Sequence, residues 1–263
     1  YSLTRVERGG TIELGIRRQP GGRFSNHLLD HLAVGDLVEL GVAQGELCWP
    51  QAAPGVGLLA AGSGITALLG LLREALQAGY AAPVTLLHYV RASGQQAYAA
   101  ELQMLMQRYP NLQVHWQLTG PEAGPQGGRF RAAHLQGMEG FALLACGPAG
   151  FVEAVRASAV GALQAEAFSP LRYAPEAGQA LRLNFSRSRL ESLGDGSRSL
   201  LEQAEAAGLR PAHGCRQGIC AGCTCTLLGG AVRDLRSGQA FAEPGQPIRI
   251  CVSAPLGDVQ LDL

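Results

Sequence analysis

Four cysteines near the carboxyl end of the chain constrain its fold more than any other feature. Cys215, Cys220 and Cys223 follow the pattern C-x4-C-x2-C, and Cys251 comes after the 27 intervening residues 224–250. A tight loop can supply three thiolates and a returning strand the fourth. Two bridged ferric ions need two thiolates each, and this spacing is that of plant-type clusters. The sequence therefore predicts a [2Fe–2S] cluster held by these four residues.

Two other metal sites use similar residues. Four thiolates also suit tetrahedral zinc, but zinc ribbons prefer paired C-x2-C knuckles and this segment has one. A Rieske centre needs two histidines within its ligand motifs, whereas here only His213 precedes the loop. Zinc remains the main alternative, and His213 is predicted to be structural. The nearby fifth cysteine, Cys225, is predicted to be a small core residue.

Composition narrows the remaining classes. The 263 residues are 47% hydrophobic, which is enough for two compact domains. The 21 basic residues are all arginine, which excludes a Walker-type phosphate loop, a pyridoxal Schiff base and a lysine general base. They balance 21 acidic residues, so no nucleic-acid partner is expected. Seven unevenly placed cysteines fit a metal site in a reducing compartment, and hence a cytoplasmic location.

From about residue 55 the hydrophobic pattern alternates between strand and helix. Strands are expected at VGLLA, PVTLLHY, LQVHWQ and GFALLAC, with helices over about 65–78, 96–108 and 149–163. Such alternation predicts a parallel sheet with helices on both faces. The uncharged stretch 47–72 is predicted to be strand and helix rather than a membrane span, because prolines and five glycines interrupt it.

The flanking segments are predicted to be built differently. Before residue 55, strands are expected over 11–17 and 37–40, and Ser25 is the expected N-cap of a short helix. After a linker at 174–178 (APEAG), the sequence predicts a strand, a helix closed by Gly208, the cysteine loop and a final strand, VQLDL.

Two glycine-containing turns follow predicted strands and open helices. The first is Gly62-Ser63-Gly64-Ile65-Thr66 and the second is Cys146-Gly147-Pro148. Because parallel strands end at one edge of a sheet, both turns are expected where such sheets bind nucleotides. Amides at a helix N-terminus can hold a pyrophosphate. For either turn alone, ordinary strand–helix packing is the alternative.

The segment after PVTLLHY bears on the choice between NADH and NADPH. Arg91 and Ser93 follow this strand, and no carboxylate follows until Glu101. An acidic residue here would favour NADH, whereas an arginine can pair with a 2′-phosphate. The sequence leans towards NADPH, with a solvated loop arginine as the alternative.

These motifs carry a family resemblance. HGCRQGICAGCTCTLLGG and IRICVSAPLGDVQLDL resemble the ferredoxin domain of flavin-dependent iron–sulfur reductases. AAGSGIT and CGPAGF resemble the pyridine-nucleotide domain of the ferredoxin–NADP reductase superfamily, although many members have proline where this chain has Ala67. The resemblance implies three parts: a partial flavin-binding β-barrel over 1–53, an α/β NAD(P)-binding domain over 54–173 and a β-grasp [2Fe–2S] domain over 179–263.

The same resemblance implies a flavin site. The superfamily carries R-x-Y-S/T and, later, G-x-x-S. Tyr1-Ser2 look like the end of the first motif, and Gly22-Arg23-Phe24-Ser25 match the second. Tyr1 would then lie against the isoalloxazine of FAD or FMN, Ser2 near its N5 atom, and Ser25 and its neighbours at its phosphate. The motif arginine and the earlier barrel strands are absent, so the chain is predicted to be truncated at its N-terminus. The residues implied at the reaction site are Tyr1, Ser2, Thr66 and Cys146.

This domain order implies a redox path. A hydride delivers two electrons and a cluster accepts one, and flavin can handle both. Electrons would run from NAD(P)H through flavin and cluster to a metal-containing oxygenase. The sequence resembles reductases that serve membrane acyl-CoA desaturases. Reductases of ring-hydroxylating oxygenases or hydroxylases are the alternative, and a passive ferredoxin-type carrier is a third. The chain is expected not to span a membrane itself but to dock on a membrane enzyme.

Overall fold

The computed structural model describes residues 1–7, 9–41, 43, 45–124, 127–168 and 180–263. The chain divides into two compact units, one of residues 1–41 and 46–168 and one of residues 42–45 and 169–263. The predicted linker at 174–178 lies outside the described residues. No helix in the described part of the chain is long and apolar enough to cross a membrane.

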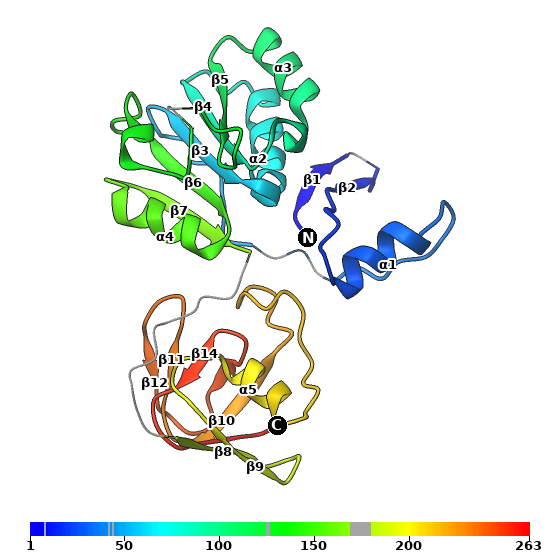
Figure 1. The fold of residues 1–263 in the computed structure, drawn as a ribbon, viewed down its shortest axis with the longest axis vertical. Helices are drawn as coiled ribbons and strands as arrows, with labels where there is room; N and C mark the ends of the chain where they lie inside the picture. The colour runs from blue at the N-terminus through cyan, green and yellow to red at the C-terminus, as the bar shows by residue number, and fades with distance from the viewer. Residues whose placement is uncertain (8, 42, 44, 125–126, 169–179) are drawn as a thin grey trace. The chain divides into compact units, whose positions relative to one another are not determined.

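A five-stranded parallel sheet forms the centre of the first unit (Figure 1). Its strands, in the order β5–β4–β3–β6–β7, are β3 (Val56–Ala61), β4 (Val84–Val90), β5 (Leu112–Leu118), β6 (Ala142–Gly147) and β7 (Leu163–Ala167). Helices α2 (Ile65–Gln77) and α3 (Ala99–Arg108) cover one face, and α4 (Ala149–Ser158) covers the other. Successive residues of one strand pack into different hydrophobic cores: on β3, Leu58 packs on the α2 side of the sheet and Leu59 on the α4 side. The predicted doubly covered parallel sheet is confirmed.

Three local predictions are wrong. The helix predicted over 149–163 ends at Ser158, and β7 follows because it pairs with β6. Residues 37–40 form no strand: among the described residues no strand lies beside them, and Leu37 is fully exposed. Ser25 is not an N-cap, because α1 (Arg23–His31) begins directly after the extended residue Gly22. This places Ser25 in the first helical turn, where its Oγ accepts from the Gln19 N–H at 3.3 Å.

A short hairpin joins the amino-terminal segment to the nucleotide sheet. Strands β1 (Leu3–Val6) and β2 (Ile12–Leu14) pair antiparallel, so the strand predicted over 11–17 is present but shorter. β1 lies against α2 at Gly70, where an added Cβ would stand 2.6 Å from the Leu3 carbonyl oxygen. The helix and strand therefore meet backbone to backbone, an approach that only glycine permits.

The described residues of the second unit form two sheets and one helix. A five-stranded sheet has the order β13–β10–β15–β8–β9, and a three-stranded sheet has the order β12–β11–β14. The strands are β8 (Leu181–Phe185), β9 (Leu190–Gly194), β10 (Thr224–Gly229), β11 (Val232–Asp234), β12 (Ala240–Phe241), β13 (Pro247–Arg249), β14 (Ser253–Pro255) and β15 (Val259–Leu261). Among the described strands of this larger sheet, β8 and β15 pair parallel and the other pairs are antiparallel, so the sheet is mixed.

Helix α5 (Leu200–Ala206) has a complete local start signal. Ser199 is the N-cap, its side chain accepts from the Glu202 N–H, and the Glu202 carboxylate accepts in turn from the Ser199 N–H. Leu200 and Leu201 on this helix pack into the same core as Phe185 on β8. A mixed sheet with one helix packed on it is the arrangement that the β-grasp prediction required.

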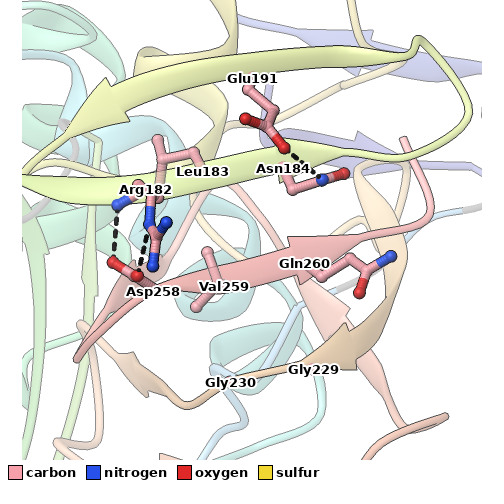
Figure 2. A pocket seen from close by; sticks show the side chains of 9 residues that line it. All are labelled: Arg182, Leu183, Asn184, Glu191, Gly229, Gly230, Asp258, Val259 and Gln260. Atoms are coloured by element: carbon pink, nitrogen blue, oxygen red, sulfur yellow. Dashed lines mark hydrogen bonds and ion pairs between the residues drawn. The ribbon is translucent and has the colours of Figure 1, made fainter.

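A shallow hollow of about 290 Å³ lies on the larger sheet of the second unit (Figure 2). Its wall includes Arg182, whose Nε donates to Asp258 Oδ2 at 2.8 Å, and Asn184, whose amide donates to Glu191 at 3.1 Å. None of the cysteines lines this hollow. It is therefore separate from the predicted cluster loop.

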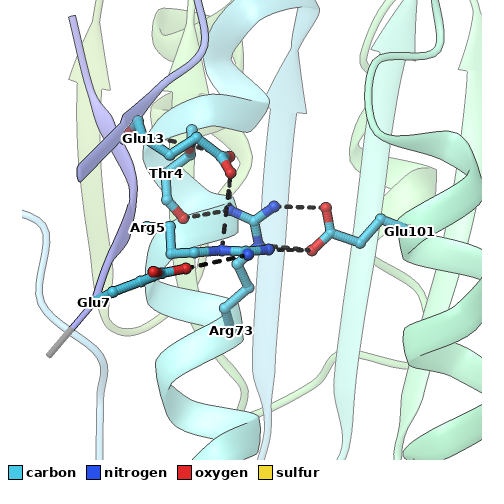
Figure 3. Close-up of polar contacts among 6 residues, drawn as sticks. All are labelled: Thr4, Arg5, Glu7, Glu13, Arg73 and Glu101. Atoms are coloured by element: carbon cyan, nitrogen blue, oxygen red, sulfur yellow. Dashed lines mark hydrogen bonds and ion pairs between the residues drawn. The ribbon is translucent and has the colours of Figure 1, made fainter. Parts of the chain in front are cut away.

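The hairpin of the first unit is fixed by one buried arginine (Figure 3). The Arg73 side chain on α2 is 8% exposed, and its Nη1 donates to the Thr4 carbonyl at 2.6 Å and to Glu13 at 3.0 Å. Its Nε and Nη2 donate to the two oxygens of Glu101 on α3 at 2.7 and 2.5 Å. The Thr4 hydroxyl and then Arg73 lower the pKa of Glu13. One guanidinium therefore ties β1, β2, α2 and α3 together.

We expect Arg73→Met to lower the free energy of unfolding of the first unit by about 3 kcal/mol. This is the low end for a broken buried ion pair, because Glu13 and Glu101 are partly exposed and can rehydrate. Urea unfolding followed by the fluorescence of Trp49 and Trp116, the chain's two tryptophans, reports on this unit alone.

The matched control is Arg18→Met, which removes an exposed ion pair with Asp30 in the same unit. We expect no measurable loss from this change. Equal stability of the two variants would contradict the role assigned to Arg73.

Candidate cofactor-binding sites

Two backbone turns meet at one edge of the parallel sheet. The turn after β3 forms a short 3-10 helix, Gly62–Gly64, with Gly62 at φ +56, and it leads directly into α2. A Cβ added to Gly64 would overlap the carbonyl oxygen of Cys146 at the end of β6. The strand order reverses between β3 and β6, because the chain adds strands on one side and then on the other. Sheets of this kind bind ligands at such a point.

Side chains in these turns hold the backbone in place. The Thr66 hydroxyl donates to the Ser63 carbonyl at 2.9 Å, and Ile65 is fully buried. Pro148 is the N-cap of α4, and a Cβ on Gly147 would stand 2.8 Å from the Ala61 Cβ. The amides at the start of α2 and α4 therefore lie on the sheet edge where a phosphate would be bound.

Cys146 lies in the core rather than on the surface of this edge. Its side chain is 0% exposed, and burial raises the pKa of its thiol. The thiol is therefore neutral and packs against the apolar side chains of the α2 face. Its predicted place at the reaction site stays a prediction, as does that of Thr66.

The loop after β4 contains a contact that sequence reasoning missed. The Ser93 N–H and hydroxyl both donate to Glu122 Oε2 at 3.1 Å. Glu122 lies in the loop after β5. The Gly120 N–H of this loop donates to the Arg91 carbonyl at 3.1 Å, which brings it next to the loop after β4. A carboxylate therefore stands beside Arg91 and Ser93. The sequence offered one indication of this contact: neighbouring parallel strands end at the same edge of a sheet, so the loops that follow them lie close together.

The predicted flavin residues gather near the start of α1. The Tyr1 ring stacks on the Phe24 ring with centroids 5.8 Å apart, so the two motif segments are in contact. Tyr1, Arg23 and Phe24 are exposed, and Ser25 is buried. The N-terminus of α1 has no side-chain cap, so its first amides are open to a phosphate.

The segment after β2 passes over the nucleotide turn. A Cβ on Gly15 would stand 2.6 Å from Thr66 Cγ2, and one on Gly62 would stand 3.5 Å from Arg17 Nη1. An exposed guanidinium therefore lies beside the first turn. Sequence reasoning did not single out Arg17, because its neighbour Gly62 is distant in the chain. The segment after β2 and the first nucleotide turn thus lie against each other in the first unit.

The four predicted cluster cysteines lie together as two pairs. In one pair, Cys220 accepts from the Cys215 N–H at 3.2 Å and Cys215 accepts from the Cys220 N–H at 3.3 Å. In the other pair, the Cys251 thiol donates to Cys223. This contact lowers the pKa of Cys223 to about 6 and raises the pKa of Cys251.

Backbone amides surround the sulfurs. Gln217 N–H donates to Cys215 Sγ at 3.3 Å, Gly218 N–H to Cys251 Sγ at 3.2 Å, and Gly222 N–H to Cys220 Sγ at 3.4 Å. Burial alone raises the pKa of Cys220, but the amides of Cys215 and Gly222 bring it below its usual value. Thiolates bound to a metal need such donors. The loop is thus arranged to hold negatively charged sulfur.

Neighbouring side chains fix the cysteine loop. Arg216, at φ +58, donates to both oxygens of Glu205 on α5, at 2.9 and 2.5 Å. The His213 Nδ1 donates to the Pro211 carbonyl at 2.9 Å, so its Nε2 accepts from Arg216 at 2.8 Å. Both nitrogens of His213 are occupied, as expected for a structural histidine. Cys225 is buried with its thiol towards the Asp262 carbonyl, which confirms the core prediction.

This donor set fits a di-iron cluster. The four thiols form two pairs, and a [2Fe–2S] cluster takes two thiolates on each iron. Nucleotide turns in one unit and a paired-thiol loop in the other define an electron-transfer reductase as the class of protein.

Comparison with known proteins identifies the family. Residues 58–157 match the oxidoreductase NAD-binding domain and residues 187–256 match the 2Fe-2S iron-sulfur cluster binding domain. The chain is 33% identical over 265 residues to the NADPH oxidoreductase of Mycobacterium tuberculosis, covering 96% of this chain and 67% of that protein. It is 33% identical over 261 residues to the heme-dependent oxidative N-demethylase beta subunit of Ectopseudomonas mendocina, covering 95% of this chain and 79% of that protein.

A solved structure has the same fold. Phthalate dioxygenase reductase matches with a TM-score of 0.63 at 23% identity, over 100% of this chain and 83% of that one. The chain belongs to the family of NAD(P)H-dependent flavin reductases with a C-terminal [2Fe–2S] ferredoxin domain. Its cofactors are accordingly a [2Fe–2S] cluster, FAD and NAD(P)H. It spans about two thirds of the length of the mycobacterial relative.

We expect Gly64→Ala to abolish nucleotide binding, because its Cβ would overlap the Cys146 carbonyl and force the two turns apart. Calorimetric titration with NADP⁺ or NAD⁺ measures the loss. Gly41→Ala is the matched control: Gly41 lies outside both turns and a Cβ there meets nothing within 4 Å, so binding should be unchanged. Normal binding by Gly64→Ala would show that the contact between the turns is dispensable.

Proposed function

We propose that this protein takes electrons from NAD(P)H and delivers them one at a time to a metal-containing oxygenase. The proposal rests on one observation. The cluster cysteines form two pairs that are surrounded by backbone amides, and they belong to the same chain as the two nucleotide turns. The family supports it, since its members include reductase components of oxygenase systems.

The four paired cysteines would hold the cluster. Each pair, Cys215 with Cys220 and Cys223 with Cys251, would supply two of its four thiolate ligands. The amides of Gln217, Gly218 and Gly222 stabilise the sulfur charge. Cys225 takes no part, because its thiol faces the Asp262 carbonyl.

The first unit binds and orients the two organic cofactors. The amides of the turns at Gly62–Thr66 and Cys146–Pro148 hold the nucleotide phosphates. Tyr1 and Ser2 lie at the flavin ring, and the first turn of α1, with Gly22, Arg23, Phe24 and Ser25, holds the flavin phosphate. When bound, flavin would accept the two electrons of a hydride and release them one at a time, as a [2Fe–2S] cluster requires.

As the electron acceptor we propose first a membrane acyl-CoA desaturase. The protein would then act in the cytoplasm and dock on that enzyme. The motifs HGCRQGIC, GGAVRDLRSG and CVSAPLGDVQLDL support this choice by resemblance. The second choice is a ring-hydroxylating oxygenase. It is supported by 30% identity over 185 residues to the reductase component of the naphthalene 1,2-dioxygenase/salicylate 5-hydroxylase systems of Ralstonia sp, covering 65% of this chain and 56% of that protein.

The visible spectrum of the full-length protein, before and after anaerobic addition of NADPH or NADH, tests the proposal. Flavin bands and a broad iron–sulfur shoulder that both bleach are expected. Iron–sulfur absorption without flavin would favour a passive carrier, and a colourless zinc protein would contradict both readings. Turnover with a purified desaturase or dioxygenase then decides between the acceptors.

We expect Cys251→Ser to lose most of the iron–sulfur absorbance and bound iron, because it removes one thiolate from the second pair. Cys225→Ala is the matched control, since its thiol lies in the same core and outside the two pairs. It should keep full iron content. Iron and sulfide assays on both variants measure the effect, and retention of the cluster by Cys251→Ser would overturn the ligand assignment.

Arg91 and Glu122 are proposed to set the preference between NADPH and NADH, with NADPH favoured. Arg91→Ala should lower the NADPH-to-NADH ratio of kcat/KM, and Glu122→Gln should raise it, because a carboxylate repels a 2′-phosphate. Each change should be roughly three- to tenfold, as exposed charges contribute on the order of 1 kcal/mol. Glu153→Gln, on the exposed side of α4, is the control. An unchanged ratio in both loop variants would refute this assignment.

A further inference from the structure

A fully buried histidine lies beneath the first nucleotide turn. His88 is on β4, opposite Ala60 of β3, and is 0% exposed. Side chains alternate along a strand, so His88 faces the same core as Leu86, on the side of α2. Its Nε2 lies 3.0 Å from the carbonyl oxygen of Gly62.

The protonation state of His88 follows from its partners. A carbonyl oxygen only accepts, so Nε2 carries the proton and donates to Gly62. Nδ1 is buried and has no hydrogen-bond partner among the described residues. Burial also lowers the pKa of the ring, so His88 is neutral. Leaving one nitrogen of a buried imidazole without a partner lowers the stability of the fold.

The hydrogen bond fixes the orientation of one peptide group. In a planar trans peptide, the carbonyl oxygen and the next N–H point in opposite directions. With the Gly62 carbonyl held towards β4, the Ser63 N–H is turned away from the sheet. Gly62 adopts this geometry at φ +56, a backbone conformation that is less favourable for residues with a side chain.

Thr66 acts on the following peptide in the same way. Its hydroxyl donates to the Ser63 carbonyl at 2.9 Å, which orients the Gly64 N–H. Two side-chain donors therefore lock the two successive peptide groups that open α2. One donor comes from the helix itself and the other from the adjacent strand.

We propose that His88 is a positioning residue for pyridine-nucleotide binding. It holds the Gly62 carbonyl so that the Ser63 amide faces the nucleotide phosphate, and it does not touch the nucleotide. The inference rests on the proposed function, because it assumes that this turn binds NAD(P)H. It adds a residue on β4 that lies outside the turn motif.

Two substitutions separate the hydrogen bond from packing. His88→Gln keeps an N–H donor at about the position of Nε2, whereas His88→Phe fills similar space without a donor. We expect His88→Phe to weaken NADP⁺ binding about tenfold and to raise KM with kcat nearly unchanged. His88→Gln should restore binding to within about threefold. Calorimetry with NADP⁺ and steady-state ferricyanide reduction, using the full-length protein, give these values.

His115→Phe is the control, because His115 is exposed on the neighbouring strand β5. Equal NADP⁺ affinity in wild type, His88→Phe and His88→Gln would overturn the proposal while leaving the proposed function intact. Failure of the wild type to bind either NADP⁺ or NAD⁺ would instead defeat the proposed function and this inference with it.

A measurement on the wild type guards against a misfolded variant. Nitrogen-15 NMR of histidine-labelled protein, with the His88 signals assigned by their absence from His88→Gln, should show that ring neutral and protonated at Nε2 near pH 7, and its signals should shift when NADP⁺ is added. A His88 ring protonated at Nδ1, or one that does not respond to NADP⁺, would overturn its role.

Discussion

Backbone amides that point at sulfur or phosphate are the interaction on which both units depend. In the second unit, five N–H groups donate to the sulfurs of the cysteine loop. In the first unit, the turns that open α2 and α4 present their amides at one edge of the sheet. Amides carry partial positive charge without a formal charge. A chain with only 16% charged residues can therefore hold thiolates and pyrophosphate.

Such sites require the main chain to approach its partner closely, which explains where glycine is needed. At Gly64 a side chain would overlap the second nucleotide turn, so the two turns can approach this closely only with glycine there. Gly218, at φ +72, turns its N–H towards Cys251. These positions could be predicted, because short motifs such as GSGIT and C-x4-C-x2-C record a local geometry. The strands and helices around them could be predicted for the same reason, since a buried parallel strand is apolar throughout.

Predictions failed where an element depends on a neighbour that is distant in the sequence. LQAEA (163–167) is rich in helix-forming residues and becomes β7 only because β6 lies beside it. LVEL (37–40) alternates as a strand should, yet no strand pairs with it in the described part of the chain. Arg73, Glu122 and His88 gave no signal because their partners lie 26 or more positions away. Their importance follows only from the folded arrangement.

The division into two units parallels a change in the chemistry. Hydride transfer needs the reacting atoms in contact, so donor and acceptor sites have to be fixed relative to each other. Arg73, Gly70 and Gly15 fix the hairpin and the segment after it onto α2, and all of these residues belong to the first unit. The four cluster cysteines belong to the second unit, which has its own core. Single-electron transfer does not need atomic contact between reacting groups. The contacts that fix the hairpin onto the nucleotide sheet therefore lie within the unit where atomic contact is required.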